Sequence, residues 1–471
     1  MLDINQMTVL KIQEALNNKK FTSYDMVLYY LDRIANIDHG ESNYNSVYEV
    51  NPDALNIARV LDKERQEGKI RGFMHGIPVL LKDNINTKDK THTTGGANIL
   101  KNHFAKEDAH IVKVLRKQGA IILGKTNLTE LACFKSFNTV NGFSSLGGYV
   151  LCPWDVEVDP SGSSTGSAVS VALNLAPVAI GTETGGSIMS PSSLNGVVGI
   201  KPTIGFTSRK GIIPISSTLD TAGPMAKNVT DAAVLLSAIR TNDIDDPITN
   251  QKNDEVIDYT KHLKLNNLKG KRVGIDRSRF KDLSLSRREH FEKIIEYMKT
   301  LGIEIVEDLK IEQTKLIYHI MKYEFKACIN KYLNSEGLNI TLKDIINFNH
   351  ENEKENLKFG QQVLLEAEHH TTGRMIEKEY FDALEEREKA KTKLEQLFKD
   401  NNLDMLYFAN YTSLGPQCGF PTMTIPIGLD EKNMPIGTYF LAPMFQEGTL
   451  INISYNIEKM INRKFNPLKN S

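Results

Sequence analysis

The chain has 471 residues, of which 40% are hydrophobic and 24% charged, as is ordinary for a globular protein with a large core. Its formal net charge of −1 argues against nucleic acid or an acidic membrane as a partner, because surfaces that bind them are strongly basic. The four cysteines form no CxxC pair, and their spacing predicts neither a zinc site nor a disulfide framework.

The sequence shows no recognisable targeting or membrane signal. Its first residues lack the basic and then apolar pattern of a secretory signal. The longest apolar run, 169–180, is interrupted by Ser170, Asn174 and Pro177 and is shorter than the roughly 20 residues of a membrane span. We therefore expect a cytoplasmic location.

Up to residue 132 the chain alternates between helical and strand patterns. The predicted elements are an amphipathic helical pair over 7–37, a charged helix over 53–68, a buried strand over 76–81, a helix over 108–119, a buried strand over 120–124 and a helix start at 128–132. Thr22 and Ser23 are typical of a helix N-terminus, and the first strand ends directly at Lys82. This alternation predicts a layered α/β core.

Two Ser/Gly-rich turns, 161–167 and 181–187, concentrate the polar residues of this core. Small apolar residues separate them over a length that fits one helix and one strand. Their central serines, Ser163 and Ser187, are 24 positions apart (187 − 163). The second turn follows the strand pattern 178–180, so we expect it at the carboxyl end of a strand, where sites of α/β sheets usually lie.

Beyond residue 203 the composition changes twice. Short apolar pieces and a helix over 231–239 come first, and from about 241 to 403 charged residues dominate, which predicts a variable helical cap with one strand at 303–306. The segment 404–471 returns to core-like sequence. Its expected elements are strands over 405–408, 423–427 and 437–441 and a closing helix over 447–462. We expect residues 1–471 to form a single domain.

The second Ser/Gly turn has the composition of a catalytic loop. A serine that attacks a carbonyl needs a base within hydrogen-bond reach and donors for the developing oxyanion. In the run 184–187 two glycines precede the serine, so the backbone amides can face an incoming oxygen. The run also fits an ordinary turn, and the pattern alone leaves both interpretations open. A phosphate-binding loop at 162–166 is disfavoured, because no Gly-Lys-Ser/Thr ending follows.

Lys82 is the candidate base. None of the 11 histidines stands in a recognisable nucleophile–base pattern. Burial at the end of an apolar strand would lower the pKa of Lys82 toward that of a usable base. Taken alone, a lysine at a strand end is more often a structural residue whose aliphatic stem is buried while its ammonium group reaches water.

Four separated motifs resemble, in order, those of the amidase signature family. They are 76–85, 123–128, 162–167 and 181–203. The match covers about 70–240, with weaker support from Thr22-Ser23, 419–421 and 435–437. The resemblance implies an α/β fold: one large α/β/α layered domain with a central mixed, mostly parallel, twisted sheet covered by helices.

The resemblance also implies a Ser–Ser–Lys triad without metal or cofactor. In it Ser187 is the nucleophile, Lys82 the base and Ser163 the bridging serine, whose preceding peptide bond is characteristically cis in the family. Neutral Lys82 would take a proton from Ser163, which takes one from Ser187. The implied oxyanion hole consists of the backbone amides of Thr184, Gly185, Gly186 and Ser187.

The chain departs from the common family pattern at Ser161, Glu183 and Met189, where many members have glycine, aspartate and a basic residue. The runs 163–169 and 211–215 look most like the peptide-amidase branch, which cleaves C-terminal carboxamides of peptides. We therefore expect an amidase that hydrolyses a carboxamide C–N bond through an acyl-enzyme. Its partner would be a small-molecule or peptide amide substrate, and its state a monomer or homodimer.

Two other functions stay open. The A subunit of a glutamine-dependent aminoacyl-tRNA amidotransferase uses the same chemistry, but the region 360–395 lacks the Tyr-Tyr segment that would support it. A non-catalytic scaffold is disfavoured, because a scaffold has no need of an activated-nucleophile set. We expect the substrate pocket to be lined by the 133–160 loop and the 310–415 region.

Overall fold

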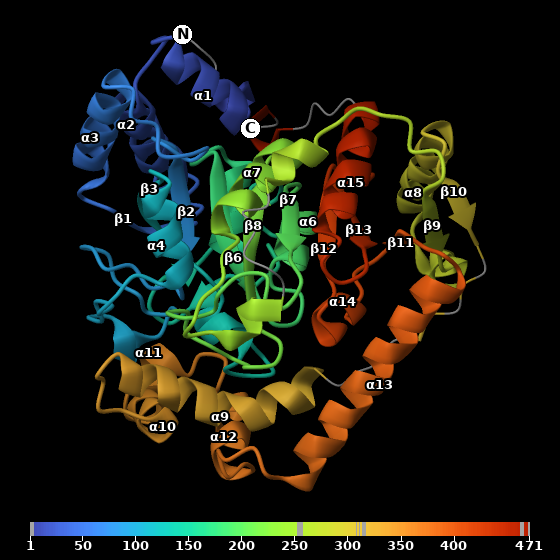
Figure 1. Cartoon of the computed structure of the whole chain (residues 1–471). Helices are drawn as coiled ribbons and strands as arrows, with labels where there is room; N and C mark the ends of the chain where they lie inside the picture. The colour runs from blue at the N-terminus through green and yellow to red at the C-terminus, as the bar shows by residue number, and fades with distance from the viewer. Residues whose placement is uncertain are drawn as a thin grey trace.

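A twisted central sheet with helices packed around it forms the body of the molecule (Figure 1). The structure is a computed structural model that describes residues 4–251, 258–307, 309, 311–312, 317–461 and 466–469. Within these ranges the sheet has 11 strands. In spatial order they are β1 Val47–Val50, β3 Ile121–Thr126, β2 Pro78–Lys82, β6 Val178–Glu183, β8 Thr221–Ala226, β7 Val198–Lys201, β12 Thr422–Leu429, β13 Pro435–Leu441, β11 Met405–Phe408, β9 Arg272–Ile275 and β10 Glu304–Val306.

The strand directions confirm a mixed sheet and correct its expected parallel majority. Parallel pairing is found in two runs, β3–β2–β6 and β11–β9–β10. Antiparallel pairing fills the centre from β6 through β8, β7, β12 and β13 to β11, and also joins β1 to β3. One physical reason is the short β12–β13 connection, a tight turn at Asp430–Asn433 that can join only antiparallel strands.

Helices enclose the sheet in two layers. Helix α7 contacts α1, α4 and α15, whereas α5 contacts α6 and strands of the sheet. The helices are α1 Val9–Asn17, α2 Ser23–Arg33, α3 Ala54–Gln66, α4 His110–Lys117, α5 Thr165–Ala172, α6 Met189–Leu194, α7 Val229–Ile239, α8 Leu285–Thr300, α9 Ile317–Ser335, α10 Leu342–Glu351, α11 Glu353–Asn356, α12 Gln362–His369, α13 Lys378–Asp400, α14 Leu414–Cys418 and α15 Glu447–Ile461. None of the helices in the described ranges combines the length and apolarity that crossing a membrane requires.

The segment expected as a helical cap has two parts. Strands β9 and β10 with α8 between them extend the main sheet. Helices α9 to α13, which we call the cap helices, lie together at one end of the molecule (Figure 1). Apolar side chains of α9, among them Phe325 and Ile329, pack against Leu131, Phe134 and Ile213 of the core loops. This packing closes the cap over the edge of the sheet where β2 and β6 end.

Most predicted elements occur within one or two residues of their expected bounds, and one differs in kind. Thr22 caps α2 as expected, in a reciprocal capping box with Asp25. The predicted helix start at 128–132 is wrong: Glu130–Cys133 is a single 3₁₀ turn whose last three residues have φ between 48° and 74°. The amide of Leu131 donates to the carbonyl of Gly95 instead of starting a helix. Asn462, the last residue of the expected closing helix, lies outside the described residues.

Candidate active site

The carboxyl ends of β2 and β6 place Lys82 beside Thr182. The two strands are parallel neighbours, with Leu81 opposite Ile180, so their ends meet at the same edge of the sheet. Strand β2 lies between β3 and β6, and every residue of it is buried. The aliphatic stem of Lys82 therefore cannot reach water, and its ammonium group must find partners inside the protein.

Three oxygen atoms accept hydrogen bonds from the Lys82 ammonium group. They are the hydroxyl of Ser163 at 2.8 Å and the hydroxyl and carbonyl of Thr182 at 2.9 and 3.3 Å. Asn84 donates to the same Thr182 hydroxyl at 2.9 Å and so fixes its position. Burial lowers the pKa of Lys82 from 10.5 to about 7, and in the part of the chain that the structure describes no carboxylate forms an ion pair with it. Lys82 can thus exchange a proton with Ser163 near neutral pH.

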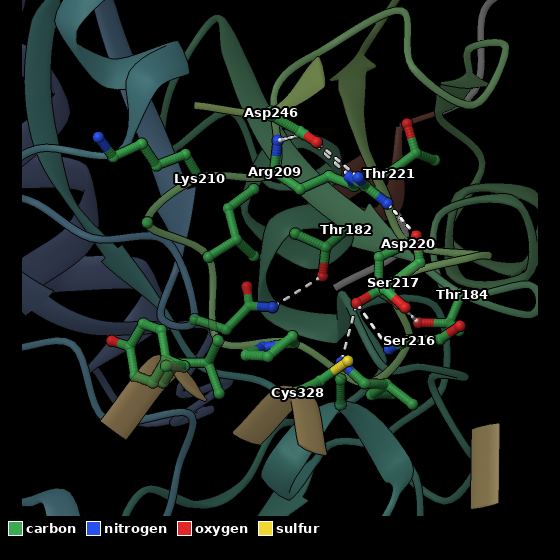
Figure 2. Close-up of a pocket in the computed structure, with 18 of the residues that line it drawn as sticks. Thr182, Thr184, Arg209, Lys210, Ser216, Ser217, Asp220, Thr221, Asp246 and Cys328 are labelled. Carbon is green, nitrogen blue, oxygen red and sulfur yellow. Dashed lines mark hydrogen bonds and ion pairs between the residues drawn. The ribbon is translucent and has the colours of Figure 1, made fainter. Parts of the chain in front are cut away.

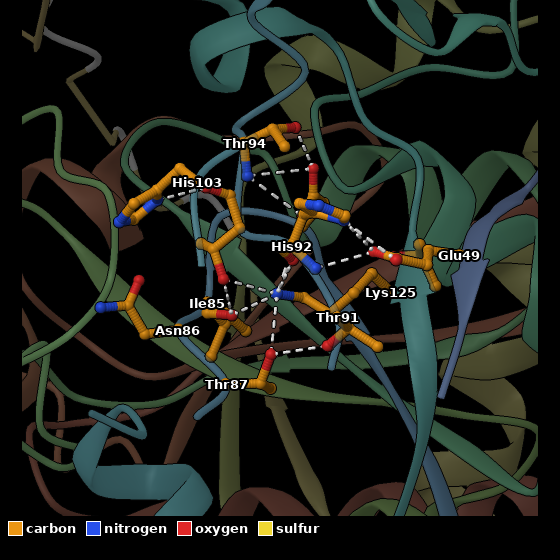
Figure 3. Close-up of polar contacts among 12 residues, drawn as sticks. Glu49, Ile85, Asn86, Thr87, Thr91, His92, Thr94, His103 and Lys125 are labelled. Carbon is orange, nitrogen blue, oxygen red and sulfur yellow. Dashed lines mark hydrogen bonds and ion pairs between the residues drawn. The ribbon is translucent and has the colours of Figure 1, made fainter. Parts of the chain in front are cut away.

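Lys125, on the adjacent strand β3, is equally buried but has the opposite surroundings (Figure 3). Its ammonium group donates to the carbonyl of His92 at 2.9 Å and to the hydroxyl of Thr93 at 2.9 Å. It also lies 3.6 Å from the carboxylate of Asp83. Neutral lysine would leave that buried carboxylate unpaired, so Lys125 is suited to hold the 83–94 loop rather than to serve as a base.

Ser163 and Ser187 lie on neighbouring turns. The peptide bond between Gly162 and Ser163 is cis, as the family resemblance implies. The amide of Ser164 donates to the carbonyl of Ser187 at 3.1 Å, which holds the two turns side by side. The half-buried hydroxyl of Ser187 makes no hydrogen bond with a described residue. The structure therefore joins Lys82 to Ser163 directly, and a hydrogen bond from Ser187 to Ser163 stays a prediction.

The loop after β6 offers unpaired backbone donors. The amides of Thr184, Gly185 and Ser187 donate to no other described residue, and Gly185 is exposed. Gly186 has φ of +115°, a conformation that favours glycine. A loop of this kind can present N–H groups to an oxyanion without losing existing hydrogen bonds.

Glu183 holds this loop from behind. Its carboxylate accepts the amides of Ile188 at 2.7 Å and Met189 at 2.9 Å, at the start of α6. The amide of Gly186 also faces the carboxylate, and burial raises the pKa of Glu183 against the effect of these donors. Glutamate at this position therefore fixes the turn between β6 and α6. Met189, the position at which many family members have a basic residue, is buried.

A cavity of about 410 Å³ opens beside this loop (Figure 2). Thr182, Thr184 and Asn84 line the end that is next to the Lys82 site. One wall is the loop 209–217 with Asp220 and Thr221, and the opposite wall is α9. The α9 residues are Cys328, Lys331, Tyr332 and Ser335, and Asp245 and Asp246 lie on the side of Arg209 and Lys210.

The lining of this cavity differs in part from that of the expected substrate pocket. The region 310–415 contributes α9, whereas the loop 133–160 contributes no residue, and Lys82, Ser163 and Ser187 are not part of the lining. The segment 209–221 was missed, because its apolar run 211–215 resembles a strand, whereas only Ile212 forms an isolated bridge, to Ile85. Its position could have been suspected from the fact that this run also resembles the peptide-amidase branch. In the described residues no group of three or more histidine, cysteine or acidic side chains could hold a metal ion.

Known proteins are similar to this chain in sequence and in structure. The family model described as Amidase matches residues 25–417. A probable amidase of Arabidopsis thaliana is 37% identical over 477 residues, which cover 97% of this chain and 90% of the relative. The A subunit of glutamyl-tRNA(Gln) amidotransferase from Clostridium botulinum strain Kyoto is 30% identical, with 98% of each chain covered. Native peptide amidase from Stenotrophomonas maltophilia superposes with a TM-score of 0.94 at 35% identity, over 98% of both chains.

Proposed function

The chain belongs to the amidase family and is a hydrolase of amide C–N bonds, and we propose that Ser187 is the nucleophile of this hydrolysis, with Ser163 as the proton bridge and Lys82 as the base. One observation carries the assignment. Lys82 is fully buried, has no carboxylate partner in the described ranges, and donates to the hydroxyl of Ser163 at 2.8 Å. Such a lysine is poised between its charged and neutral forms, which is what a base for a serine hydroxyl requires.

The first half of the reaction forms an acyl-enzyme. Neutral Lys82 accepts the hydroxyl proton of Ser163 while Ser163 accepts that of Ser187. The Ser187 oxygen bonds to the amide carbon, and the carbonyl electron pair moves to oxygen, where the amides of Thr184, Gly185 and Ser187 can stabilise the negative charge. The amide of Gly186, which we expected among these donors, faces the carboxylate of Glu183 instead. The C–N bond then breaks, and the departing nitrogen receives a proton through Ser163. Water repeats these steps on the ester and releases a carboxylic acid.

The cavity supports a peptide or small amide as substrate. It begins at Thr184 in the proposed oxyanion loop, so an acyl group bonded to Ser187 would have room to extend into it. Isoleucine side chains at 212, 213 and 215 make the adjacent wall apolar. Similarity to peptide amidase over almost the whole chain supports a peptide whose C-terminal carboxamide is cleaved to release ammonia.

The proposal is tested with Ser187→Ala, for which we expect loss of turnover and of labelling by a fluorophosphonate, since the variant removes the attacking oxygen. Ser190→Ala is the matched control, because Ser190 is a half-buried serine of the same segment. Ammonia release is measured over C-terminal peptide amides, aryl and fatty amides and glutamine. Labelling of Ser187→Ala at the wild-type rate would refute the nucleophile.

The same screen separates the alternative functions. The amidotransferase relative shares 30% identity with this chain, so glutamine is included as a substrate. Glutaminase activity that appears only with a second protein chain would favour the amidotransferase. Absence of turnover and of labelling in the wild-type chain would favour a scaffold.

A further inference from the structure

Asp220 connects the proposed oxyanion loop to the wall of the cavity (Figure 2). One of its carboxylate oxygens accepts the hydroxyl of Thr184 at 2.6 Å. The other accepts the amides of Ile215 at 2.8 Å and Ser216 at 2.9 Å. A single carboxylate thus holds two segments that lie 31 positions apart in the sequence (215 − 184).

These three hydrogen-bond donors are the main compensation for the cost of burying the Asp220 carboxylate. Arg209 acts to lower the pKa of Asp220, but the guanidinium group of Arg209 pairs with Asp246. Asp220 forms no ion pair among the described residues. It is half-buried and lines the cavity, and burial raises its pKa to about 6. A carboxylate kept in such a place must be held by its hydrogen bonds.

The wall on the other side of Asp220 is stiff. Ser216 donates through its hydroxyl to the carboxylate of Glu324, a fully buried residue of α9. Glu324 also accepts the amide of Thr218 at 3.0 Å and the hydroxyl of Tyr380 at 2.6 Å. Displacement of the wall is therefore resisted from the α9 side and can be passed on through Asp220.

We propose that Asp220 is a positioning residue that couples the fit of the acyl group in the cavity to the geometry of the oxyanion loop. An acyl group that fills the cavity contacts the Ile215 side of the carboxylate, while Thr184 lies on its other side. The amide of Thr184 is one of the proposed oxyanion donors, so its position affects the transition state more than substrate binding. The inference rests on the proposed function, because it assigns a role within the same site.

The test is a double-mutant cycle between Thr184 and Asp220. Thr184→Val removes only the hydroxyl whose hydrogen bond Asp220 accepts. Asp220→Asn removes the negative charge and keeps the shape of the side chain. Two N-acetylated peptide amides that differ only in leucine or glycine as the acyl residue serve as substrates. For the leucine amide we expect each single variant to lower kcat by about tenfold with KM changed less than about threefold, and the double variant to lose no more than either single one. The glycine amide, which does not reach the wall, should lose less than about threefold.

Two controls distinguish positioning from a general loss of structure. Thr184→Ser keeps the hydroxyl and should restore kcat. Thr371→Val matches Thr184→Val in burial, at 7% against 6% exposure, and also loses one hydrogen bond, to Ala367, but lies away from the site. Multiplicative losses in the double variant, equal losses for both amides, or a similar loss in Thr371→Val would overturn the proposal. Fluorophosphonate labelling of the wild-type chain and of Ser187→Ala reports separately on the proposed function, since a wrong nucleophile would show there and leave the cycle unchanged.

Discussion

Burial alone does not turn a lysine into a base, as the comparison of three residues shows. Lys82, Lys125 and Lys201 are all fully buried. Lys125 faces the carboxylate of Asp83, and Lys201 donates to a carbonyl at 2.7 Å while two glutamates oppose the fall of its pKa, which burial lowers to about 8. Lys82 donates its hydrogen bonds only to neutral oxygens of Ser163 and Thr182. Carboxylates oppose the fall of the pKa in Lys82 as well, so what distinguishes Lys82 is that its ammonium group donates to a serine hydroxyl, which can pass a proton on.

The pH dependence of turnover follows from Lys82. Its pKa in the folded chain is about 7, and only the neutral form can accept a proton, so kcat/KM should rise with pH and reach half its maximum near pH 7. Below that value the rate should fall by about tenfold per pH unit. The measurement is a pH–rate profile of a C-terminal peptide amide from about pH 5 to about pH 9, with chemistry shown to limit the rate.

Lys82→Met is the control for this profile. It removes the base and should lower kcat by at least about a hundredfold, with no step near pH 7 in the activity that remains. Its stability below pH 7 should not fall, because a lysine whose folded pKa lies below its unfolded value costs stability at low pH, and the variant removes that cost. A flat wild-type profile would contradict the assignment of Lys82.

At the scale of the element, the turn between β6 and α6 explains why two adjacent glycines have different constraints. A methyl group on Gly186 would meet the ring of Tyr411 at 3.0 Å, and the backbone there has φ of +115°. A methyl group on Gly185 would meet the side chain of Ile317 at 3.1 Å, in an exposed position without positive φ. A side chain at position 186 is therefore opposed by both the backbone conformation and the ring of Tyr411. At position 185 it is opposed only by the side chain of Ile317, which can move.

Alanine at these two positions should therefore have unequal effects. We expect Gly186→Ala to lower kcat/KM by about a hundredfold or more, because the strained loop displaces the proposed oxyanion donors. Gly185→Ala should cost less than about tenfold, since Ile317 can shift. Steady-state kinetics with one peptide amide, together with fluorophosphonate labelling rates, compares the two. Equal losses would mean that the loop does not depend on the conformation of Gly186.

The elements that the sequence predicted well are those with a strong local pattern. The strand expected over 405–408 matches β11, and the continuous apolar runs 76–81 and 120–124 correspond to β2 and β3 within two residues. The helix start at 128–132 failed because the amide of Leu131 is taken by Gly95, a partner more than thirty positions away. Short edge strands such as β1 carry too little apolar pattern to be recognised.

The residues of the candidate site likewise fall into those that a local motif predicts and those that it does not. Lys82, Ser163 and Ser187 stand in motifs that a single sequence displays, and the structure joins the first two. The parts that were missed, Thr182 as a partner of Lys82 and Asp220 as the tie between loop and wall, depend on contacts across 100 and 36 positions. No local pattern encodes such contacts, because they arise only when the sheet and α9 are assembled.

At the scale of the whole molecule, Glu324 attaches the cap helices to the core. It lies on α9 and holds the loop 216–218 through Ser216 and the two polar groups of Thr218. Tyr380 of α13 donates to the same carboxylate at 2.6 Å. The helices that close the cavity and the loop that forms its wall thus share one acceptor.

Glu324→Ala should loosen this attachment. It leaves several buried donors without an acceptor, which we expect to lower the free energy of unfolding by about 2–3 kcal/mol. Because α9 lines the cavity and Glu324 also holds the wall that Asp220 ties to the oxyanion loop, KM for a peptide amide should rise and kcat should fall together. Thermal unfolding and steady-state kinetics measure both effects, and Glu324→Gln, which keeps one acceptor oxygen, should be intermediate. An unchanged free energy of unfolding together with an unchanged KM would contradict this role.

The place of the last strands in the sheet has a consequence for synthesis on the ribosome. Strands β12 and β13 come from residues 422–441, yet they lie between β7 and β11 and join the two parts of the sheet. Translation from the end of β7 to the end of β13 adds 240 residues (441 − 201), which takes on the order of 10–50 seconds at ordinary elongation rates. For most of that time β7 is an open sheet edge on a nascent chain, and β11 joins it only after residue 408 has been added. Such edges invite pairing with other chains, so faster elongation, or chaperones that cover the edge of β7 until the last strands emerge, should raise the yield of folded enzyme.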